Sequence, residues 1–151
     1  MSYSLWASDA PEILITKGDR QRLSQILSDH AAARPWSAVE FLVRELLRAR
    51  VVDDDAAPDD LVTMRSRLDF REDGSEAART GTLVYPGESS LYEDAICVLT
   101  PLGAALLGVS AGQSIPDPRS GEGRITVAKV LYQPEASRRK DRLLQPPYGT
   151  G

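Results

Sequence analysis

The spacing of apolar residues divides the chain into a helical part and a strand-rich part. The first stripe at helical spacing comprises Leu23, Ile26, Leu27 and His30. Thr16 or Asp19 can cap the helix that carries this stripe. After a break at residues 31–35, the second stripe comprises Val39, Leu42, Val43, Leu46 and Leu47. Two amphipathic helices with a short break between them predict an antiparallel helical hairpin, or short coiled coil, over residues 13–52.

Beyond residue 60 the apolar period changes from helical to two, which is the period of a β-strand. Alternating apolar residues predict strands over residues 61–70, 80–85 and 124–132. Turn-forming residues separate the first two strands at residues 71–75. We therefore expect a small antiparallel β-sheet in this part of the chain.

The stretch Ile96–Ile115 predicts a buried strand followed by a capped helix. The Thr100 hydroxyl can cap the helix, and Pro101 suits the first helical position because the N–H that it lacks would have no helical partner there. The apolar residues at helical spacing are Leu102, Ala105, Leu106 and Val109. A short strand is expected near Ser114. This stretch contains no acid or base, so it favours a core-forming unit and a binding scaffold over a catalytic one.

The remaining segments are interpreted as connections and chain ends. Residues 1–12 are polar and irregular, and we expect a flexible arm there. Residues 53–60 hold five aspartates and no base, and such a run of like charges predicts a solvated acidic linker. Residues 137–151 are expected to form a disordered tail. The fold class is therefore α+β, with a helical hairpin, a linker and a sheet domain over residues 61–136 that holds one short helix.

Charge and composition narrow the classes of function. The chain has 151 residues and a net charge of −4, which argues against a protein that binds nucleic acid through phosphate contacts. The chain has one cysteine, Cys97, and one histidine, His30. These are too few for the usual zinc sites. No catalytic constellation is visible either, so we expect no metal, no cofactor and no enzymatic activity.

The sequence also favours a location inside the cell. Its apolar runs fall far short of the roughly 20 residues that span a bilayer. Residues 1–16 lack the basic start and apolar core of a signal peptide. A single cysteine cannot form an intrachain disulfide, which fits a reducing compartment. We therefore expect a cytoplasmic protein that makes no membrane contact.

Four segments in the second half of the chain carry a family resemblance. They are, in order, Val62–Leu68, Arg79–Pro86, Val98–Gly108 and Val130–Ala136. Together they resemble the regulator of nucleoside diphosphate kinase (Rnk) family, which is related to the Gre transcript-cleavage factors. The helices that precede them match that family in position and length more than in sequence.

The resemblance implies a fold and a partner. It implies a C-terminal domain similar to FK506-binding proteins (FKBP-like) and an N-terminal coiled-coil arm. Gre factors insert such an arm into the secondary channel of RNA polymerase, and their C-terminal domain grips the channel rim. The resemblance thus implies binding to RNA polymerase at the β′ side of the rim and competition with Gre factors. It implies contact with DNA only through the polymerase. It also implies an indirect link to nucleoside diphosphate kinase.

The tip between the two predicted helices departs from the Gre pattern. Gre arms carry acidic residues at the tip, where they help to hold a second magnesium ion and activate RNA cleavage. Here the segment Asp29–Trp36 has no adjacent pair of carboxylates. A second hard cation would need such anionic ligands. We therefore expect no stimulation of transcript cleavage.

Five residues are candidates for partner contact. Three of them, Leu99, Thr100 and Pro101, form the strand-to-helix corner that the Gre family uses against the polymerase rim, with Leu99 standing where an acidic residue is common. A role of Thr100 and Pro101 as a helix cap is supported equally well. The other two, Arg34 and Trp36, lie at the tip. Packing of Trp36 across the end of the hairpin is the alternative to a contact role.

Two other functions are compatible with the implied fold. An FKBP-like domain raises the possibility of a peptidyl-prolyl isomerase, which needs an apolar cleft lined by aromatic side chains. The chain has only two Phe, and both Trp precede the linker, so the sheet domain is poor in such groups. A generic protein-interaction module is the second alternative. An isomerase assay and recovery of polymerase subunits from a lysate would separate these classes.

Overall fold

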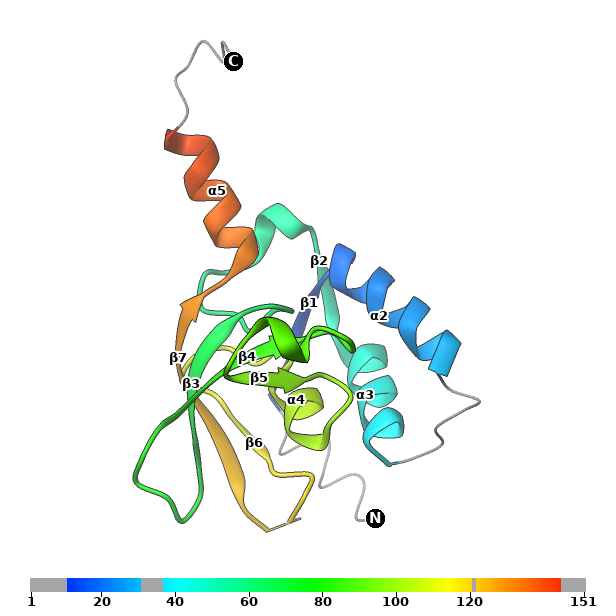
Figure 1. The fold of residues 1–151 in the computed structure, drawn as a ribbon, viewed down its shortest axis with the longest axis vertical. Coiled ribbons are helices and arrows are strands. Elements are labelled where there is room, and N and C mark those ends of the chain that lie inside the picture. Colours follow the sequence, from blue (N-terminus) through cyan, green and yellow to red (C-terminus); the bar gives the residue numbers. More distant parts are fainter. Residues whose placement is uncertain (1–10, 31–36, 121, 145–151) are drawn as a thin grey trace.

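The computed structural model describes residues 11–30, 37–120 and 122–144 (Figure 1). Its helices are α2 (Lys17–His30), α3 (Ser37–Arg48), α4 (Pro101–Leu106) and α5 (Pro134–Leu144), with 3-10 turns η1 (Asp54–Ala56) and η2 (Ser89–Leu91). Its strands are β1 (Leu14–Thr16), β2 (Arg50–Val52), β3 (Arg67–Glu72), β4 (Arg79–Val84), β5 (Ala95–Cys97), β6 (Ser114–Pro116) and β7 (Arg124–Tyr132). Most of the predicted N-terminal arm lies outside the described residues.

Helices α2 and α3 form where the apolar stripes predict them. Thr16 caps α2, because its hydroxyl accepts a hydrogen bond from the Asp19 backbone N–H at 3.2 Å. Leu23 of α2 and Leu42 of α3 are fully buried. The connection over residues 31–36 lies outside the described residues, so the antiparallel hairpin stays a prediction.

A two-stranded parallel sheet joins the ends of the helical part. Strand β1 enters α2 and strand β2 leaves α3, and Leu14 pairs with Arg50 in their register. The Leu14 backbone N–H also donates to the Gly108 carbonyl at 3.2 Å. This bond connects the helical part to the loop after α4. Strands of three residues are too short for an alternating apolar pattern to be recognised in the sequence. The pairing of β1 with β2 was therefore not predicted.

The second sheet has five strands in the order β5-β4-β3-β7-β6. The prediction of an antiparallel sheet is correct for three strand pairs and wrong for the fourth, because β5 runs parallel to β4. Residues 85–94 connect the end of β4 to the start of β5, so that the two neighbouring strands run in the same direction. The strand predicted over residues 61–70 is also shorter than expected. Residues 61–66 form no strand, and within this range Leu61 makes an isolated bridge with Ser110.

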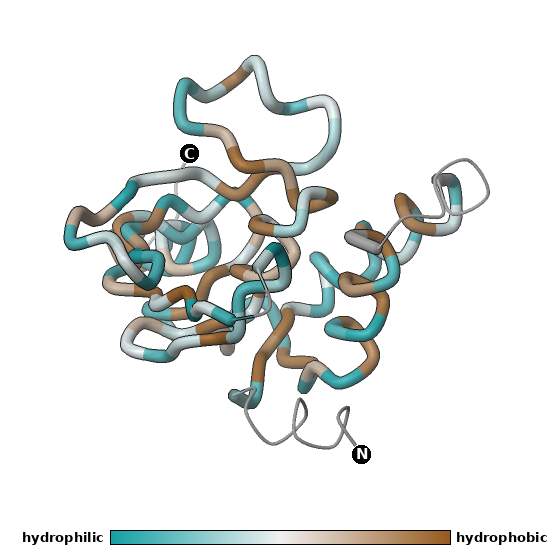
Figure 2. Tube along the Cα trace, turned by 90° about the horizontal axis from the view of Figure 1, so that it is seen from below, coloured by the Kyte–Doolittle hydropathy of each residue, from teal (hydrophilic) through white to brown (hydrophobic). Residues whose placement is uncertain are grey.

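One hydrophobic core joins the helical part and the sheet. Leu23 and Leu42 belong to the same buried cluster as Phe70 of β3 and Leu106 of α4. Helix α3 packs against α4, and apolar segments occur in both parts of the trace (Figure 2). The helical part therefore shares one core with the sheet unit, through the packing of α3 on α4, and is not connected to it by a hinge alone.

The acidic segment 53–60 is exposed to solvent except at Ala57, and it also contacts the rest of the fold. An Asp54 carboxylate oxygen accepts a hydrogen bond from the Gly18 backbone N–H at 3.0 Å, at the start of α2. Lys17 and Asp53 form an ion pair at 2.7 Å. Ala57 is 2% exposed. Negative side chains beside the first turn of α2 also interact favourably with the helix dipole.

Helix α5 covers residues that were predicted to be disordered. The helix runs to Leu144, so that prediction is wrong for residues 137–144, while residues 145–151 lie outside the described residues. Two arginines on one face of α5 bind the acidic segment. Arg139 contacts Asp59 and Arg142 contacts Asp55, each at 2.6 Å. These contacts join residues that are 80 or more positions apart in sequence.

We expect the double variant Asp55→Asn/Asp59→Asn to loosen α5 without unfolding the core. The two ion pairs are exposed, so together they stabilise α5 only weakly. Amide hydrogen exchange in α5 should therefore accelerate by roughly fivefold, while exchange in β3 and β7 should not change. Asp60→Asn is the matched control, since no ion pair of Asp60 is present among the described residues. Equal exchange in both variants would contradict the assignment.

Candidate partner-binding surfaces

The corner between β5 and α4 is fixed by one side chain. The Thr100 hydroxyl accepts a hydrogen bond from the Gly103 backbone N–H at 3.1 Å and donates one to the Cys97 carbonyl at 2.6 Å. Thr100 has extended backbone angles, and Pro101 occupies the first turn of α4. The predicted helix cap is therefore confirmed. One hydroxyl ties the end of the strand to the start of the helix, so the corner is rigid.

The three corner residues differ in what they can offer to a partner. Leu99 is 7% exposed and belongs to the hydrophobic core. Thr100 and Pro101 are half-buried, so part of each remains open to solvent. Arg34 and Trp36 lie outside the described residues. A contact role of these five residues stays a prediction, and Leu99 supports the corner from inside.

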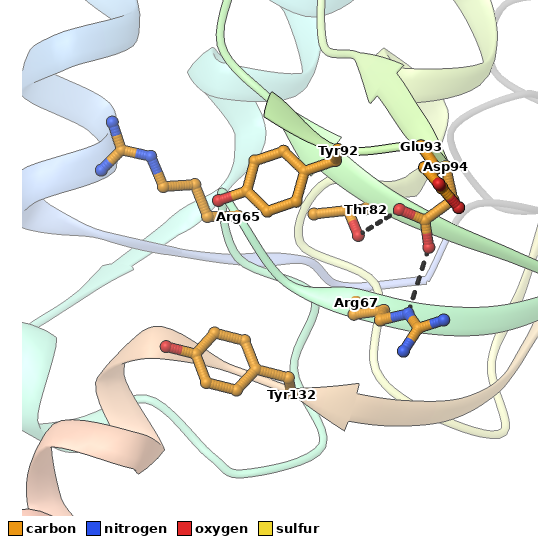
Figure 3. Close-up of a pocket in the computed structure, with 7 residues that line it drawn as sticks. All are labelled: Arg65, Arg67, Thr82, Tyr92, Glu93, Asp94 and Tyr132. Atoms are coloured by element: carbon orange, nitrogen blue, oxygen red, sulfur yellow. Dashed lines mark hydrogen bonds and ion pairs between the residues drawn. The ribbon is translucent and has the colours of Figure 1, made fainter. Parts of the chain in front are cut away.

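A groove crosses the solvent side of the five-stranded sheet (Figure 3). It has a volume of about 360 Å³ and is lined by Arg65, Arg67, Thr82, Tyr92, Glu93, Asp94 and Tyr132. The pairing of Arg67 with both Thr82 and Tyr132 places β7, β3 and β4 side by side beneath it.

Polar contacts within the groove hold its floor. Asp94 accepts hydrogen bonds from Arg67 at 3.1 Å and from the Thr82 hydroxyl at 2.9 Å. Tyr92 and Tyr132 lie on opposite sides of the groove (Figure 3), and they are 38% and 49% exposed. Sequence reasoning missed this site. The two tyrosines are 40 residues apart, and only the register of the sheet brings them together.

A buried polar cluster lies where α2, the loop 61–66 and β4 meet. One Asp19 oxygen accepts a hydrogen bond from the Met64 backbone N–H and the other accepts one from the Tyr85 hydroxyl, both at 3.0 Å. On the other side of the loop, Thr63 donates to Glu135 at 2.7 Å. Two buried carboxylates thus hold one loop between the helical part and the start of α5.

The Asp19 carboxyl group titrates in an unusual range. Burial raises its pKa to about 6, and the nearby Glu135 charge adds to that increase. Hydrogen bonds from Met64, Tyr85 and Thr16 oppose the increase but do not cancel it. The pKa of Tyr85 is raised in turn, first by burial and then by Asp19. We interpret this cluster as a determinant of stability, because Asp19, Tyr85 and Glu135 are all buried.

Metal and membrane contact were also considered. Across residues 11–30, 37–120 and 122–144, no three His, Cys, Asp or Glu side chains cluster closely enough to hold a metal ion. Within the same ranges, no helix combines the length and the apolar character that a bilayer crossing requires.

Family models match both parts of the chain. The model described as "Rnk N-terminus" matches residues 11–52, and the model described as "Transcription elongation factor, GreA/GreB, C-term" matches residues 57–132. The Regulator of nucleoside diphosphate kinase of Escherichia coli (strain K12) is 36% identical over 129 residues, which cover 84% of this chain and 94% of that protein. The chain belongs to the Rnk family.

Gre proteins are similar to this Rnk family member as well. Transcription elongation factor GreA of Roseiflexus castenholzii is 31% identical over 136 residues, covering 79% of this chain and 87% of that protein. A solved structure, "Prokaryotic transcription elongation factor GreA/GreB from Nitrosomonas europaea", is 35% identical with a TM-score of 0.63, and covers 81% of this chain and 99% of that one. The fold is therefore GreA/GreB-like, and the relatives are named as regulators and transcription factors.

The matched ranges show which of the sites described above the family models cover. The corner at Thr100 and the groove at Tyr92 and Tyr132 both lie in the GreA/GreB C-terminal match. Helix α5 begins at Pro134, beyond both matches. Its ion pairs with the acidic segment are thus a feature that the family models do not cover.

Proposed function

We propose that this Rnk family member regulates transcription by binding RNA polymerase at the rim of its secondary channel, on the β′ subunit. Its relatives include proteins named as transcription elongation factors, and it has their fold. Its sheet unit acts as an FKBP-like docking domain, and α2 and α3 form the arm that points inward. It acts in the cytoplasm and reaches DNA only through the polymerase. Its effect on nucleoside diphosphate kinase is indirect.

The observation that carries this proposal is the rigid, half-exposed corner at Thr100 and Pro101. The hydroxyl of Thr100 fixes the corner from within, and Leu99 anchors it in the core. A contact surface that is already ordered loses little conformational entropy on binding. The same residues therefore serve as both helix cap and docking surface.

Competition for polymerase tests the docking assignment. We expect Pro101→Glu to weaken binding to purified RNA polymerase by roughly tenfold, because it places an unpaired charge in the interface. A glutamate in the first turn of α4 suits the helix dipole, so the fold should persist. Thr100→Ser keeps both corner hydrogen bonds and is the control. Displacement of a labelled Gre factor measures both variants, and equal displacement by the two would count against the corner.

We also propose that the protein does not stimulate transcript cleavage and is not an enzyme. Its tip segment Asp29–Trp36 offers no adjacent carboxylates in its sequence, and a second metal ion in the polymerase would need them. Backtracked polymerase should therefore release no short RNA when this protein is added, while a Gre factor should release it under the same conditions. Efficient cleavage would overturn this part of the proposal.

The alternatives predict other results. A peptidyl-prolyl isomerase would accelerate the cis-to-trans change of a proline peptide, and a generic interaction module would bind proteins but leave polymerase unoccupied. The groove carries two tyrosines among charged side chains, which is not the apolar cleft that an isomerase requires. We therefore retain polymerase binding as the function that the family and the corner support best.

A further inference from the structure

The groove on the sheet carries polar groups that the fold does not use. Among the described residues, Tyr92, Tyr132 and Glu93 make no side-chain hydrogen bond or ion pair. The other polar side chains of the groove are satisfied, since Asp94 holds Arg67 and Thr82. Unused tyrosine hydroxyls and an unused carboxylate around one open groove indicate a surface made for an external group.

The charged side chains that line the groove sum to zero, and the balance becomes negative when Glu88, which pairs with Arg65 from outside the lining, is included. Arg65 is neutralised by Glu88, which accepts two of its N–H donors, and Arg67 is neutralised by Asp94. This pairing leaves Glu93 as the unpaired charge. An anionic ligand such as a phosphate would find both arginines occupied and Glu93 repelling it. A cation would find a free carboxylate.

We propose that this groove binds an arginine side chain of a partner protein. Tyrosine rings attract a cation placed over their faces, and phenol oxygens accept hydrogen bonds. A planar guanidinium can stack on a ring and still donate several hydrogen bonds, which a lysine ammonium cannot match. The groove is open, and Tyr92 and Tyr132 are 38% and 49% exposed, so a side chain from a protein surface can reach it.

This site is separate from the proposed polymerase-docking corner. None of the groove-lining residues belongs to the segment Leu99–Pro101. The groove crosses the open side of β3 and β4 (Figure 3), whereas the corner ends β5 and begins α4. The family member would therefore carry two contact surfaces on one sheet unit, and the second is tested without polymerase.

A peptide titration of the full chain tests the proposal. The probe is the capped tripeptide Gly-Arg-Gly, and the control probe replaces its arginine by citrulline, which has nearly the same shape and no charge. In amide NMR spectra, the arginine peptide should shift the signals of Thr82, Tyr92–Asp94 and Tyr132 saturably. The citrulline peptide should leave them unchanged. Equal shifts with both peptides, shifts elsewhere only, or saturation by inorganic phosphate at these signals would overturn the proposal.

Two variants identify the groups responsible. Glu93→Gln should raise the dissociation constant of the arginine peptide roughly two- to fivefold, as expected for an exposed ion pair. Glu76→Gln is the matched control, because Glu76 is exposed and lies outside the groove. Tyr132→Ala should weaken binding by a similar factor, and Tyr132→Phe should retain the ring contribution. Unchanged affinity in Glu93→Gln would refute the charge argument even if Tyr132→Ala fails to fold.

Discussion

Replacing Gly103 with alanine is expected to lower the free energy of unfolding by about 3 kcal/mol or more. A Cβ atom at this position would overlap the Cys97 carbonyl oxygen, and would lie 2.8 Å from the Cys97 carbonyl carbon and 2.9 Å from the Val98 Cα. All three are backbone atoms, so no side chain can rotate away. Helix α4 would have to move off the end of β5, and the corner at Thr100 would move with it.

Helix propensity alone would predict that Gly103→Ala raises the free energy of unfolding, which is the opposite of the expected result. In an exposed helix, glycine to alanine gains about 1 kcal/mol, whereas here close packing of α4 on β5 decides. Gly87→Ala is the matched control, because nothing lies within 4 Å of its Cβ position and only its φ of +89° opposes the change. That variant should lose about 1 kcal/mol. Urea unfolding of both variants measures the difference, and equal midpoints would contradict the packing argument.

Local chemistry made the corner predictable from the sequence. A threonine followed by a proline at the start of an apolar stripe is typical of a helix N-terminus, with the threonine as cap and the proline as the first helical residue. For α2 the sequence left two possible caps, Thr16 and Asp19, and in the structure the Thr16 hydroxyl accepts the hydrogen bond. The need for glycine at position 103 could not be read this way. It depends on how closely α4 approaches a strand that pairs in parallel with β4.

Long-range charge pairing was not predictable from local pattern. The acidic segment 53–60 and the basic run in α5 each read as solvated when considered alone. Together they are complementary, and the ion pairs of Arg139 and Arg142 connect the two segments. The groove has the same origin, since the register of β7 on β3 places Tyr132 beside Arg67, across the groove from Tyr92. Contacts that depend on topology were the ones missed.

The Asp19 carboxyl group is expected to make the free energy of unfolding fall as pH rises from about 4 to about 6. Its pKa is about 6 in the folded chain and 3.8 as the ordinary value. Between these values the folded state holds a proton that the unfolded state has lost, so raising the pH favours unfolding. The shift corresponds to roughly 3 kcal/mol at most. Carboxyl groups with lowered pKa, such as Glu72 and Asp117, act in the opposite direction.

The variant Asp19→Asn isolates this contribution. An asparagine can keep the geometry of the neutral carboxyl group: its amide oxygen can accept from the Met64 N–H and its NH₂ group can donate to the Tyr85 oxygen. The Tyr85 hydroxyl proton then loses Asp19 as its acceptor, and this loss offsets part of the gain from removing the buried charge. The variant should therefore match the natural chain near pH 4 and exceed its unfolding free energy above pH 6, by about 1–3 kcal/mol.

Chemical unfolding at a series of pH values measures the two proteins side by side. Their difference cancels the other carboxyl groups, because those are shared and most lie far from Asp19. A difference that grows between pH 4 and pH 6 and then levels off would identify Asp19 as a buried group that is retained at a cost in stability. A variant that is less stable at every pH would show instead that the hydrogen bonds to the charged carboxylate outweigh its burial. In the expected case, the charged Asp19 carboxylate lowers the free energy of unfolding above pH 6, while its hydrogen bonds connect the loop 61–66 to α2.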